Sequence, residues 1–350
     1  MSSRYREIEA RGHPRELGQA VGEAARNEIT GFSEIALERV NLTVNVSSEK
    51  AMEVAAASIA YVEDYAPDMM EEMRGMSEGS GVSLEDLMLL QVRNQLRADD
   101  AGCTSFALGP VASNTNASLI GQNWDNDPEL DKFTIVLTRR PAGRPAHINV
   151  TQAGLIAYIG LNDAGVSLCL NTLPAPSREL GVPHYFTVRG IYESDSLEGA
   201  ADAVRRATRA IPANIILTTP QGPADFEVTI DDCHILRDPK NRLVTHTNHC
   251  LHPDLVAINE EFAELINSGP RLERTEQALR TDAPLGVDHL KALLSDHDNH
   301  PRSICRHLND DPGTGIWMTV FSVIMEPEQG RMHVSRGNPC SNPYEVYELS

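Results

Sequence analysis

Apolar residues recur every three or four positions along the first hundred residues of the chain. This spacing predicts amphipathic helices over residues 14–40 and 48–65. Pro67 begins a third helix, which a Gly-Ser-Gly triplet at 79–81 ends. Ser83 is a typical N-cap residue for a fourth helix. The front of the chain is therefore expected to be helical.

After Gly102 the helical spacing gives way to short apolar runs separated by turn residues, which predict strands. The predicted strands are 104–108, 118–122, 133–138, 155–160, 166–170, 213–219, 224–230, 243–247, 316–325 and 330–336. Helical spacing returns over 186–210, 254–266, 271–281 and 287–295. Grouped strands that alternate with grouped helices favour mainly antiparallel sheets covered by helices over a doubly wound parallel sheet.

Composition and charge narrow the function classes. With 350 residues and 41% hydrophobic residues, the chain can bury a substantial core. Its net charge of −20 repels nucleic-acid phosphates and anionic membranes, so neither is expected as a partner. The first residues carry charges throughout and no apolar stretch typical of a secretory signal, and the longest apolar run is too short to span a bilayer. We expect a cytoplasmic protein.

Six cysteines are scattered along the chain without a C-x-x-C pair. They are Cys103, Cys169, Cys233, Cys250, Cys305 and Cys340. In a large chain without a secretory signal, most are expected to be reduced and buried.

Cys103 directly follows Gly102 where helix is expected to give way to strand, after Asp99 and Asp100. A buried thiol at a strand start is one interpretation. The other is self-processing, because a thiol can attack the unhindered carbonyl of a preceding glycine. Cleavage would leave a chain that begins with Cys103, whose new α-amine has a reference pKa of about 7.7–8.0 and suits a general base.

Three polar positions near strand ends are further candidates. Asp125 lies one hairpin after Cys103, where a carboxylate could orient an α-amine or an arginine; the alternative is an ordinary strand end. Asn171 and Asn248 each follow a predicted strand, where an amide could stabilise an oxyanion or simply cap a loop. Arg306 follows a Pro-containing turn and could bind a carboxylate, or be an ordinary surface arginine.

Three histidines in one short segment invite a metal interpretation. His246, His249 and His252 recur at a spacing of three, with Cys250 among them. They follow a Val-containing strand, however, where His246 and His249 would point to opposite faces. A metal-binding or regulatory protein is therefore kept as an alternative, and we expect neither a metal ion nor a cofactor.

Taken together and in order, these motifs resemble the isopenicillin N acyltransferase family (acyl-coenzyme A:6-aminopenicillanic acid acyltransferases), a branch of the N-terminal nucleophile (Ntn) hydrolases. The matching segments are Gly-His-Pro-Arg-Glu-Leu-Gly at 12–18, Met-Arg-Gly-Met at 73–76, Gly-Cys-Thr-Ser at 102–105, Gly-Gln-Asn-Trp-Asp at 121–125, His-Thr-Asn-His-Cys at 246–250 and Ser-Ile-Cys-Arg at 303–306. The resemblance implies a four-layer αββα sandwich of two antiparallel sheets, class α+β.

The resemblance also implies roles for single residues. The Gly102–Cys103 bond resembles the family's autocatalytic cleavage site, which would divide the chain into a helical segment 1–102 and an Ntn β chain 103–350. Cys103 then acts as nucleophile, and Asn248 as the oxyanion asparagine. Asp125 and Arg306 match residues that support the α-amine and the cleavage. Asn171 is a looser match to a second oxyanion donor. The expected supporting residues are Asn123, Thr104 and Ser303. Asn126 departs from the family pattern, in which we expect an aromatic residue.

The sequence therefore predicts an enzyme, a self-processing cysteine amidohydrolase that cleaves a small N-acyl compound through a thioester. The first alternative is an acyltransferase that uses acyl-coenzyme A, which would need a basic patch for the nucleotide phosphates. Two arginine clusters are the candidates for this patch, 139–144 and 205–209, and we interpret both as solvated faces. The cleaved segment 1–102 is expected to remain as a partner of the β chain. The oligomeric state is not predicted.

Overall fold

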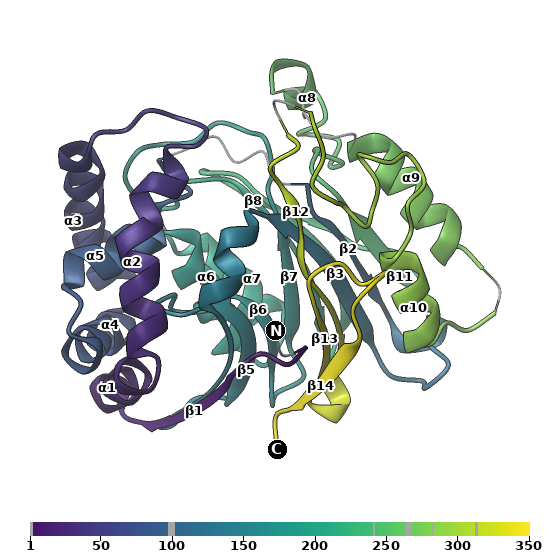
Figure 1. Ribbon diagram of the computed structural model, residues 1–350. Helices are drawn as coiled ribbons and strands as arrows, with labels where there is room; N and C mark the ends of the chain where they lie inside the picture. Colours follow the sequence, from purple (N-terminus) through teal and green to yellow (C-terminus); the bar gives the residue numbers. More distant parts are fainter. Residues whose placement is uncertain (1–2, 97–101, 241, 263–267, 282, 312–313) are drawn as a thin grey trace.

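Two stacked β-sheets with helices on both outer sides organise the chain, as the ribbon in Figure 1 shows. The computed structural model describes residues 3–96, 102–240, 242–262, 268–281, 283–311 and 314–350. Residues Asp99 and Asp100 before the predicted cleavage site lie outside this described part.

The strands divide between the two sheets. They are β1 (Glu7–Gly12), β2 (Thr104–Leu108), β3 (Leu119–Asn126), β4 (Thr134–Pro141), β5 (His147–Gln152), β6 (Ile159–Asn162), β7 (Ser167–Asn171), β8 (Ala213–Thr219), β9 (Gly222–Val228), β10 (Cys233–Leu236), β11 (Leu243–His246), β12 (Met318–Glu326), β13 (Arg331–Arg336) and β14 (Tyr344–Glu348). Within the described residues, one sheet has the order β1-β4-β5-β6-β7-β8-β9-β10 and the other β11-β2-β3-β12-β13-β14. Strand pairing is antiparallel except between β1 and β4, which run parallel.

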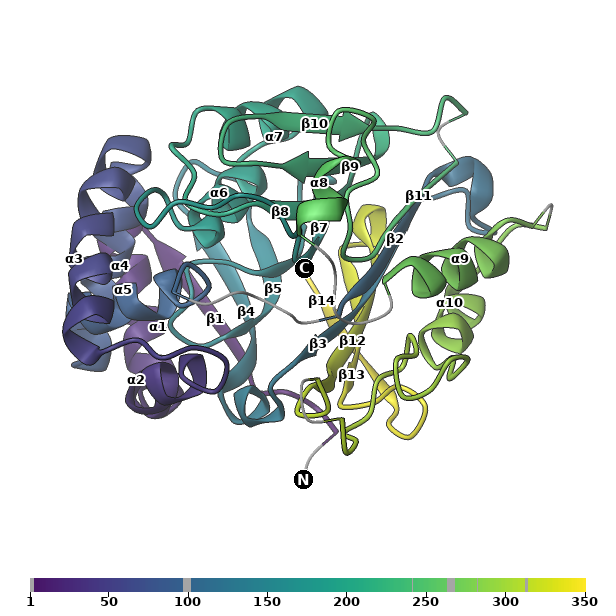
Figure 2. The ribbon, with the colours of Figure 1, turned by 90° about the horizontal axis from the view of Figure 1, so that it is seen from above.

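The helices form the outer layers. They are α1 (Pro14–Ala24), α2 (Arg26–Val40), α3 (Ser48–Tyr65), α4 (Pro67–Ser80), α5 (Leu84–Val92), α6 (His184–Tyr192), α7 (Leu197–Arg205), α8 (Ile258–Glu261), α9 (Ser268–Leu279) and α10 (Val287–Leu294). In Figure 1, α1–α7 lie on the side of the larger sheet, and α9 and α10 lie beyond the smaller sheet. The view from above in Figure 2 shows the same separation. The predicted four-layer αββα class is confirmed.

Most predicted helices are present, with boundaries set by local signals. The predicted helix 14–40 is two helices, since Ala25 has a non-helical backbone that divides α1 from α2. Gly81 ends α4 in the left-handed conformation, with φ +80, which glycine adopts without strain. The Ser83 hydroxyl accepts the Asp86 amide at 3.1 Å and begins α5 as predicted.

Two helical predictions were too long. The span 186–210 holds α6 and α7, separated by residues 193–196. The span 254–266 holds only the single turn of α8 among its described residues, and 263–267 lie outside them.

Four strands were missed by the sequence analysis: β1, β5, β10 and β14. The front of the chain is therefore not wholly helical, because β1 pairs with β4 at the edge of the larger sheet. The hairpin predicted around residues 326–328 is present between β12 and β13. The predicted strand 155–160 overlaps β6 only at its end.

Glycines let two helices of the front segment pack backbone against backbone. A Cβ on Gly18 of α1 would lie 1.9 Å from the Glu72 carbonyl oxygen, and one on Gly75 of α4 would lie 2.0 Å from that of Arg15. Gly22 and Gly79 make the same contact one turn further on. This packing explains why two of the motifs that carry the family resemblance contain glycines.

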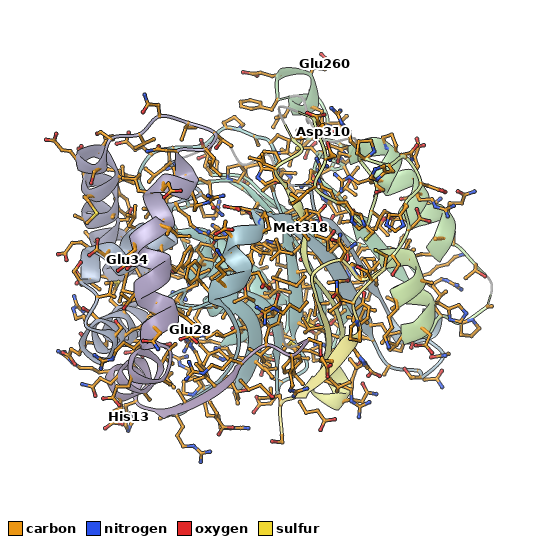
Figure 3. All side chains as sticks on the ribbon, viewed as in Figure 1. His13, Glu28, Glu34, Glu260, Asp310 and Met318 are labelled. Atoms are coloured by element: carbon orange, nitrogen blue, oxygen red, sulfur yellow. The ribbon has the colours of Figure 1, made fainter. Side chains whose placement is uncertain are left out.

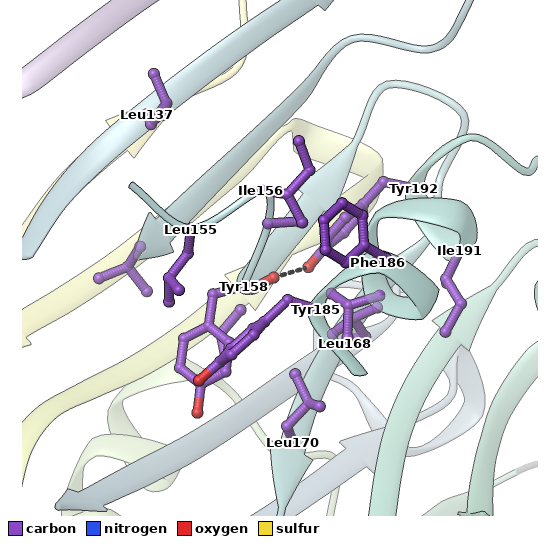
Figure 4. Packing of buried hydrophobic residues seen from close by; sticks show 14 of the residues in the cluster. Leu137, Leu155, Ile156, Tyr158, Leu168, Leu170, Tyr185, Phe186, Ile191 and Tyr192 are labelled. Carbon is purple, nitrogen blue, oxygen red and sulfur yellow. Dashed lines mark hydrogen bonds between the residues drawn. The ribbon is translucent and has the colours of Figure 1, made fainter. Parts of the chain in front are cut away.

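Aromatic side chains in the core connect the two sheets. The Trp124 indole of β3 donates to the Tyr158 hydroxyl at 2.7 Å, next to the larger sheet. Close by, the Tyr192 hydroxyl donates to the Tyr158 carbonyl at 2.8 Å, with Tyr185 and Phe186 of the same helix packed alongside (Figure 4). These contacts bury α6 against the larger sheet.

Acidic side chains are distributed over the outside of the molecule. Glu34, Glu260 and Asp310 are exposed on three separate segments (Figure 3). Among the described residues, no helix combines the length and apolar character needed to cross a bilayer. Arg139 is not part of a solvated face as predicted: it is fully buried, and its Nε lies 2.9 Å from the Glu72 carboxylate, which neutralises it.

Candidate active site

Cys103 lies at the start of β2, between β11 and β3 of the smaller sheet. The register pairs Thr104 with Asn123, so Asp125 returns beside the start of β2 as predicted from the hairpin spacing. The thiol is 3% exposed and points to the carbonyl oxygen of Asp125, 4.0 Å away. The predicted nucleophile therefore lies beside the backbone of Asp125.

The Asp125 carboxylate is fully buried, and one of its two oxygens has a hydrogen-bond partner among the described residues. Its Oδ1 accepts the Thr319 hydroxyl at 2.7 Å, whereas its Oδ2 has no hydrogen-bond partner within the described residues. Burial raises the pKa of Asp125 to about 7, although the charge of Arg306 and the Thr319 hydrogen bond act in the opposite direction. This carboxyl group can take up or release a proton near neutral pH.

Arg306 is buried near Asp125 and is held by backbone carbonyls. Its Nη2 donates to Thr314 O at 2.8 Å and its Nε to Trp317 O at 3.3 Å. Its Nη1 has no hydrogen-bond partner in the part of the chain that the structure describes. The surface interpretation of Arg306 is therefore excluded, because the side chain is 1% exposed.

Asn248 lies beyond the end of β11, and an arginine connects it to Cys103. The amide Nδ2 donates to the hydroxyl of Thr172 at 2.8 Å and to its carbonyl at 3.1 Å, and Oδ1 accepts Nη2 of Arg271 at 2.9 Å. The other guanidinium nitrogen, Nη1, donates to the Cys103 carbonyl at 2.6 Å and lies 3.4 Å from the Gly102 carbonyl oxygen. Arg271 thus joins both carbonyls next to the 102–103 bond to the predicted oxyanion residue.

Arg271 was not among the predicted site residues. It stands in the first turn of α9, on the same face as Leu272, Thr275 and Leu279, all of which are buried. The sequence does contain a signal for Arg271, namely a charged residue on the apolar face of an amphipathic helix. Isolated buried charges are costly, so such a residue normally has a buried partner. Its partners could not be found this way, since they lie on β2 and beyond β11.

Asn171 lies at the end of β7, in the larger sheet, and faces β2 and β3. Its Nδ2 donates to the Ser105 hydroxyl at 2.6 Å and to Asn214 Oδ1 at 2.8 Å. Its Oδ1 accepts the Gln122 amide at 3.1 Å. Both amide hydrogens of Asn171 are therefore used between the sheets, rather than directed at an oxyanion.

The three predicted supporting residues hold the smaller sheet to the outer helices. The Thr104 hydroxyl accepts Nη1 of Arg271 at 2.9 Å. The Asn123 amide donates to the carbonyls of Leu294 at 2.7 Å and Ile304 at 2.9 Å. The Ser303 hydroxyl donates to the Cys305 carbonyl at 2.7 Å and closes the turn before Arg306.

The three histidines of the predicted metal segment have different partners. His246 is buried with its Nε2 2.9 Å from Glu227, and His249 Nδ1 lies 2.7 Å from the Ser268 hydroxyl. His252 lies instead with Asp254 and His234. Burial acts to lower the pKa of His246, but the carboxylates of Asp225 and Glu227 outweigh it and raise that pKa. The histidines do not form a common ligand set.

The fold and this site define the class of the protein. A cysteine at the start of a central strand of an αββα sandwich, with a buried aspartate and a buried asparagine close by, is the arrangement of an Ntn-type enzyme. Residues 112–341 match the family described as acyl-coenzyme A:6-aminopenicillanic acid acyl-transferase, and the chain belongs to this family. It is accordingly an enzyme that transfers an acyl group or hydrolyses a C–N bond.

Known relatives span the chain at low identity. The 40 kDa form of acyl-coenzyme A:6-aminopenicillanic-acid-acyltransferase from Emericella nidulans is 27% identical over 98% of this chain and 95% of its own length. Among solved structures, the Caenorhabditis elegans orthologue of N-acylethanolamine-hydrolyzing acid amidase is 15% identical, with 71% of this chain and 100% of that chain covered and a TM-score of 0.47. Penicillin V acylase from Agrobacterium tumefaciens is 10% identical, with 71% and 86% covered and a TM-score of 0.48.

Proposed function

We propose that the chain is a self-processing amidohydrolase that uses Cys103 as an N-terminal nucleophile on small N-acyl compounds. One observation carries the proposal: the Arg271 guanidinium lies 3.4 Å from the Gly102 carbonyl oxygen, 2.6 Å from that of Cys103 and 2.9 Å from Asn248 Oδ1. A cysteine with a purely structural role would not need a buried cation beside the peptide bond that precedes it. The same cation would stabilise the oxyanion that forms when the thiol attacks that bond.

Self-cleavage would proceed through a thioester. The Cys103 thiol loses its proton, and the sulfur attacks the Gly102 carbonyl carbon, whose developing oxyanion is stabilised by Arg271. The C–N bond then breaks, and the leaving nitrogen takes up the proton that the thiol released and becomes the α-amine of Cys103. Water hydrolyses the thioester and restores the thiol, and the proton of the new Gly102 carboxylic acid passes to the α-amine, which leaves a carboxylate and an ammonium group.

The unpartnered Oδ2 of Asp125 is a natural acceptor for the new ammonium group. In the uncut chain this buried oxygen has no hydrogen-bond donor within the described residues. A protonated α-amine on Cys103 would supply the donor and lower the pKa of the carboxyl group. We propose that Asp125 orients the amine, so that the amine can accept the thiol proton during turnover.

In turnover, the α-amine of Cys103 takes the thiol proton, the thiolate attacks the acyl carbonyl of the substrate, and the α-amine passes that proton to the departing amine. Water then hydrolyses the thioester, which releases the acid and restores the thiol.

Asn248 Nδ2 donates to the hydroxyl and the carbonyl of Thr172, in the loop after β7, and is the proposed oxyanion donor. It would exchange the Thr172 hydroxyl for the oxyanion while Arg271 holds the opposite end of the same amide. Asn171 remains a looser candidate for the second donor. Since both of its amide hydrogens are engaged, we assign it mainly to positioning Ser105 on β2.

The segment 1–102 is proposed to stay with the β chain after cleavage. Its strand β1 pairs with β4, and the Tyr5 amide donates to the Tyr347 hydroxyl at 2.7 Å. Residues of both segments share one buried core. Cleavage would therefore produce two chains within one composite domain, rather than release a propeptide.

The alternative function is acyl transfer from coenzyme A, the activity in the name of the Emericella nidulans relative. It needs cations for the nucleotide phosphates, but the two predicted arginine clusters are engaged elsewhere. Arg140 contacts Glu9, Arg205 contacts Glu198, and Arg209 is buried and donates to backbone carbonyls. These contacts favour hydrolysis over transfer. A purely metal-binding role has less support, since His246, His249 and His252 have separate partners.

Release of amine from N-acyl substrates tests the proposal. Purified protein is incubated with a panel of aryl-acetylated and fatty-acylated small amines, and separately with acyl-coenzyme A with and without an acceptor amine. We expect release of amine from at least one N-acyl compound without coenzyme A. Turnover that requires both acyl-coenzyme A and an acceptor would establish the transferase instead, and no reaction with any substrate would contradict both.

Replacing Arg271 with lysine is expected to slow both cleavage and turnover about 10- to 100-fold. Lysine keeps the charge but cannot bridge Asn248 and the Cys103 carbonyl, and one hydrogen bond to a charged group contributes about 1.5–3 kcal/mol. The measurement is the rate of appearance of the two fragments together with kcat. Arg209→Lys, a change of the same type at another buried arginine, should leave both rates within a few fold; equal effects of the two changes would contradict the assignment.

Replacing Asp125 with asparagine is expected to change the pH dependence of stability. Burial raises the pKa of Asp125 from its ordinary 3.8 to about 7, so the folded state holds this proton more tightly than the unfolded state does. The aspartate chain should therefore lose stability as pH rises through this window, whereas asparagine cannot ionise.

Urea unfolding at several pH values, with Cys103→Ala in both chains to keep them uncut, measures this effect. The stability of the Asp125→Asn chain relative to its parent should increase between about pH 4 and pH 7 and level off above. A difference that stays constant over this range would show that Asp125 is not held in its protonated form.

A further inference from the structure

A second group of chemically reactive side chains gathers away from Cys103. His297, Cys305, His307 and Cys340 place their ligand atoms within 4.8 Å of one another. They come from two segments: the connection between α10 and β12, which carries His297, Cys305 and His307, and the turn between β13 and β14, which carries Cys340. This ligand group of two cysteines and two histidines was not visible in the sequence, where its members are spread over more than forty positions.

The distances within the ligand group are those of tetrahedral coordination. His297 Nε2 lies 3.0 Å from His307 Nε2, which in turn lies 3.7 Å from Cys305 Sγ and 3.4 Å from Cys340 Sγ. Around a tetrahedral zinc ion, with Zn–N of about 2.0 Å and Zn–S of about 2.3 Å, the N···N edge is about 3.3 Å and the N···S edge about 3.5 Å. The three distances from His307 Nε2 therefore agree with tetrahedral edges to within about 0.3 Å, and all four ligand atoms lie within 4.8 Å of one another.

The surroundings also suit a metal-bound thiolate. The Asn338 amide lies 3.6 Å from Cys305 Sγ and donates to the Arg306 carbonyl at 2.6 Å. Such a donor orients a ligand sulfur and stabilises its negative charge. The Cys305 amide is fixed by the Asp296 carbonyl at 2.9 Å, next to His297. Cys305 is therefore buried and held by the fold, His307 is partly buried, and His297 and Cys340 complete the group from the exposed side.

We propose that this ligand group binds one Zn²⁺ ion as a closed structural site. Two cysteines and two histidines fill all four tetrahedral positions, which leaves none for water or substrate. As the ion binds, the two thiols release their protons to solvent, and two thiolates balance its charge. The sequence analysis expected no metal, and this geometry leads to a different conclusion.

The zinc ion would join two loops of the smaller sheet next to the catalytic site, the one between α10 and β12 and the one between β13 and β14. Two of its ligands, Cys305 and His307, flank Arg306, whose buried guanidinium acts on Asp125. The ion would therefore fix the backbone of Arg306 without contact to the reacting atoms. Its proposed role is to stabilise the fold and position this segment, independently of which acyl compound the enzyme uses.

The closest competitor is the buried group formed by Asp225, Glu227 and His246. There His246 Nε2 already contacts Glu227 at 2.9 Å, and Glu227 accepts the amides of Leu251 at 2.5 Å and His252 at 2.9 Å. These ligand atoms are engaged in holding the loop that carries Asn248, so the first group is the better metal site.

Metal analysis of the full chain tests the proposal. The protein is purified without a metal-affinity column, given Zn²⁺, passed through a desalting column and analysed for bound metal. We expect about one zinc per chain, and, with Co²⁺ in its place, the visible and charge-transfer absorption of a tetrahedral thiolate site. Two variants at exposed ligands, Cys340→Ser and His297→Asn, should lose the stoichiometric metal and the absorption and show a lower Tm in zinc.

Cys233→Ser is the matched control, because Cys233 is a partly exposed cysteine outside the ligand group. It should keep the full zinc content. Three results would overturn the proposal: no retained metal with no Co²⁺ spectrum, a zinc content that the two ligand variants leave unchanged, or a Cys305–Cys340 disulfide found by peptide mapping in place of the metal. Circular dichroism of each variant confirms that a loss of metal is not a loss of fold.

Discussion

Replacing Cys103 with alanine should yield a folded, uncut chain without enzymatic activity. Cys103 would supply the attacking sulfur for cleavage and, after cleavage, both the nucleophile and the α-amine base of turnover. Removal of a catalytic nucleophile of this kind lowers kcat by about 10⁶-fold. Denaturing mass spectrometry and the amine-release assay measure the two consequences separately. The side chain lost is small and buried, so circular dichroism should be unchanged.

Cys169→Ala is the control for this experiment. Cys169 lies on the facing strand β7 and is also buried. Its burial is the main cause of the raised pKa of its thiol, and the charge of the nearby Cys103 raises that pKa further. This variant should be cut and active within a few fold of the parent chain. Fragments or turnover in Cys103→Ala, or equal losses in both variants, would exclude Cys103 as the nucleophile.

Replacing Asn248 with alanine should leave the chain folded but reduce kcat about 10²–10³-fold, the effect of removing one oxyanion donor. Alanine also leaves Nη2 of Arg271 without its Asn248 partner, so cleavage of the 102–103 bond should slow as well. KM should change less than kcat, because the oxyanion forms in the transition state rather than in the bound substrate.

Asn162→Ala is the matched control for Asn248. Asn162 is fully buried, and its amide donates to the carbonyls of Tyr192 at 3.0 Å and Ser194 at 2.8 Å, away from the site. Its loss should lower the free energy of unfolding by about 1–3 kcal/mol, since buried acceptors lose their donor, with kcat almost unchanged. If Asn248→Ala shows only this pattern, Asn248 is structural.

Local signals in the sequence located the elements that hold the predicted nucleophile, Cys103. The apolar run 104–108 is β2, and the hairpin that follows returns Asp125 beside Cys103. These relations depend on neighbours in sequence and on the period of two along a strand. For the same reason Ser83 was recognised as a cap, because the group it binds is three residues away.

Strands at sheet edges were harder to predict. In β1, the alternation of Ile8 and Ala10 with charged residues is a genuine strand pattern, but it is short and precedes a long helical region. β10 has four residues and half-exposed side chains throughout, so it carries little hydrophobic signal. Pairing partners, and not local preference, hold such strands in place.

Contacts between distant segments account for what the sequence could not reveal at the site. Arg271 and Asn248 are 23 positions apart and contact each other, and Arg271 also contacts the carbonyls of Gly102 and Cys103, more than 160 residues earlier in the chain. Asn171 was predicted from its place at a strand end, which is correct, but the direction of its amide is set by Ser105 and Asn214 on other strands. Only the packed sheets determine these partners.

The intact mass of freshly purified protein, recorded under denaturing conditions, tests the central claim most directly. The account predicts two species, residues 1–102 and residues 103–350, with the second beginning at a free Cys103 amine. Edman sequencing or an amine-reactive tag identifies that terminus. A single full-length mass in an enzymatically active preparation, or a cut at another bond, would contradict the assignment of Cys103 as an N-terminal nucleophile.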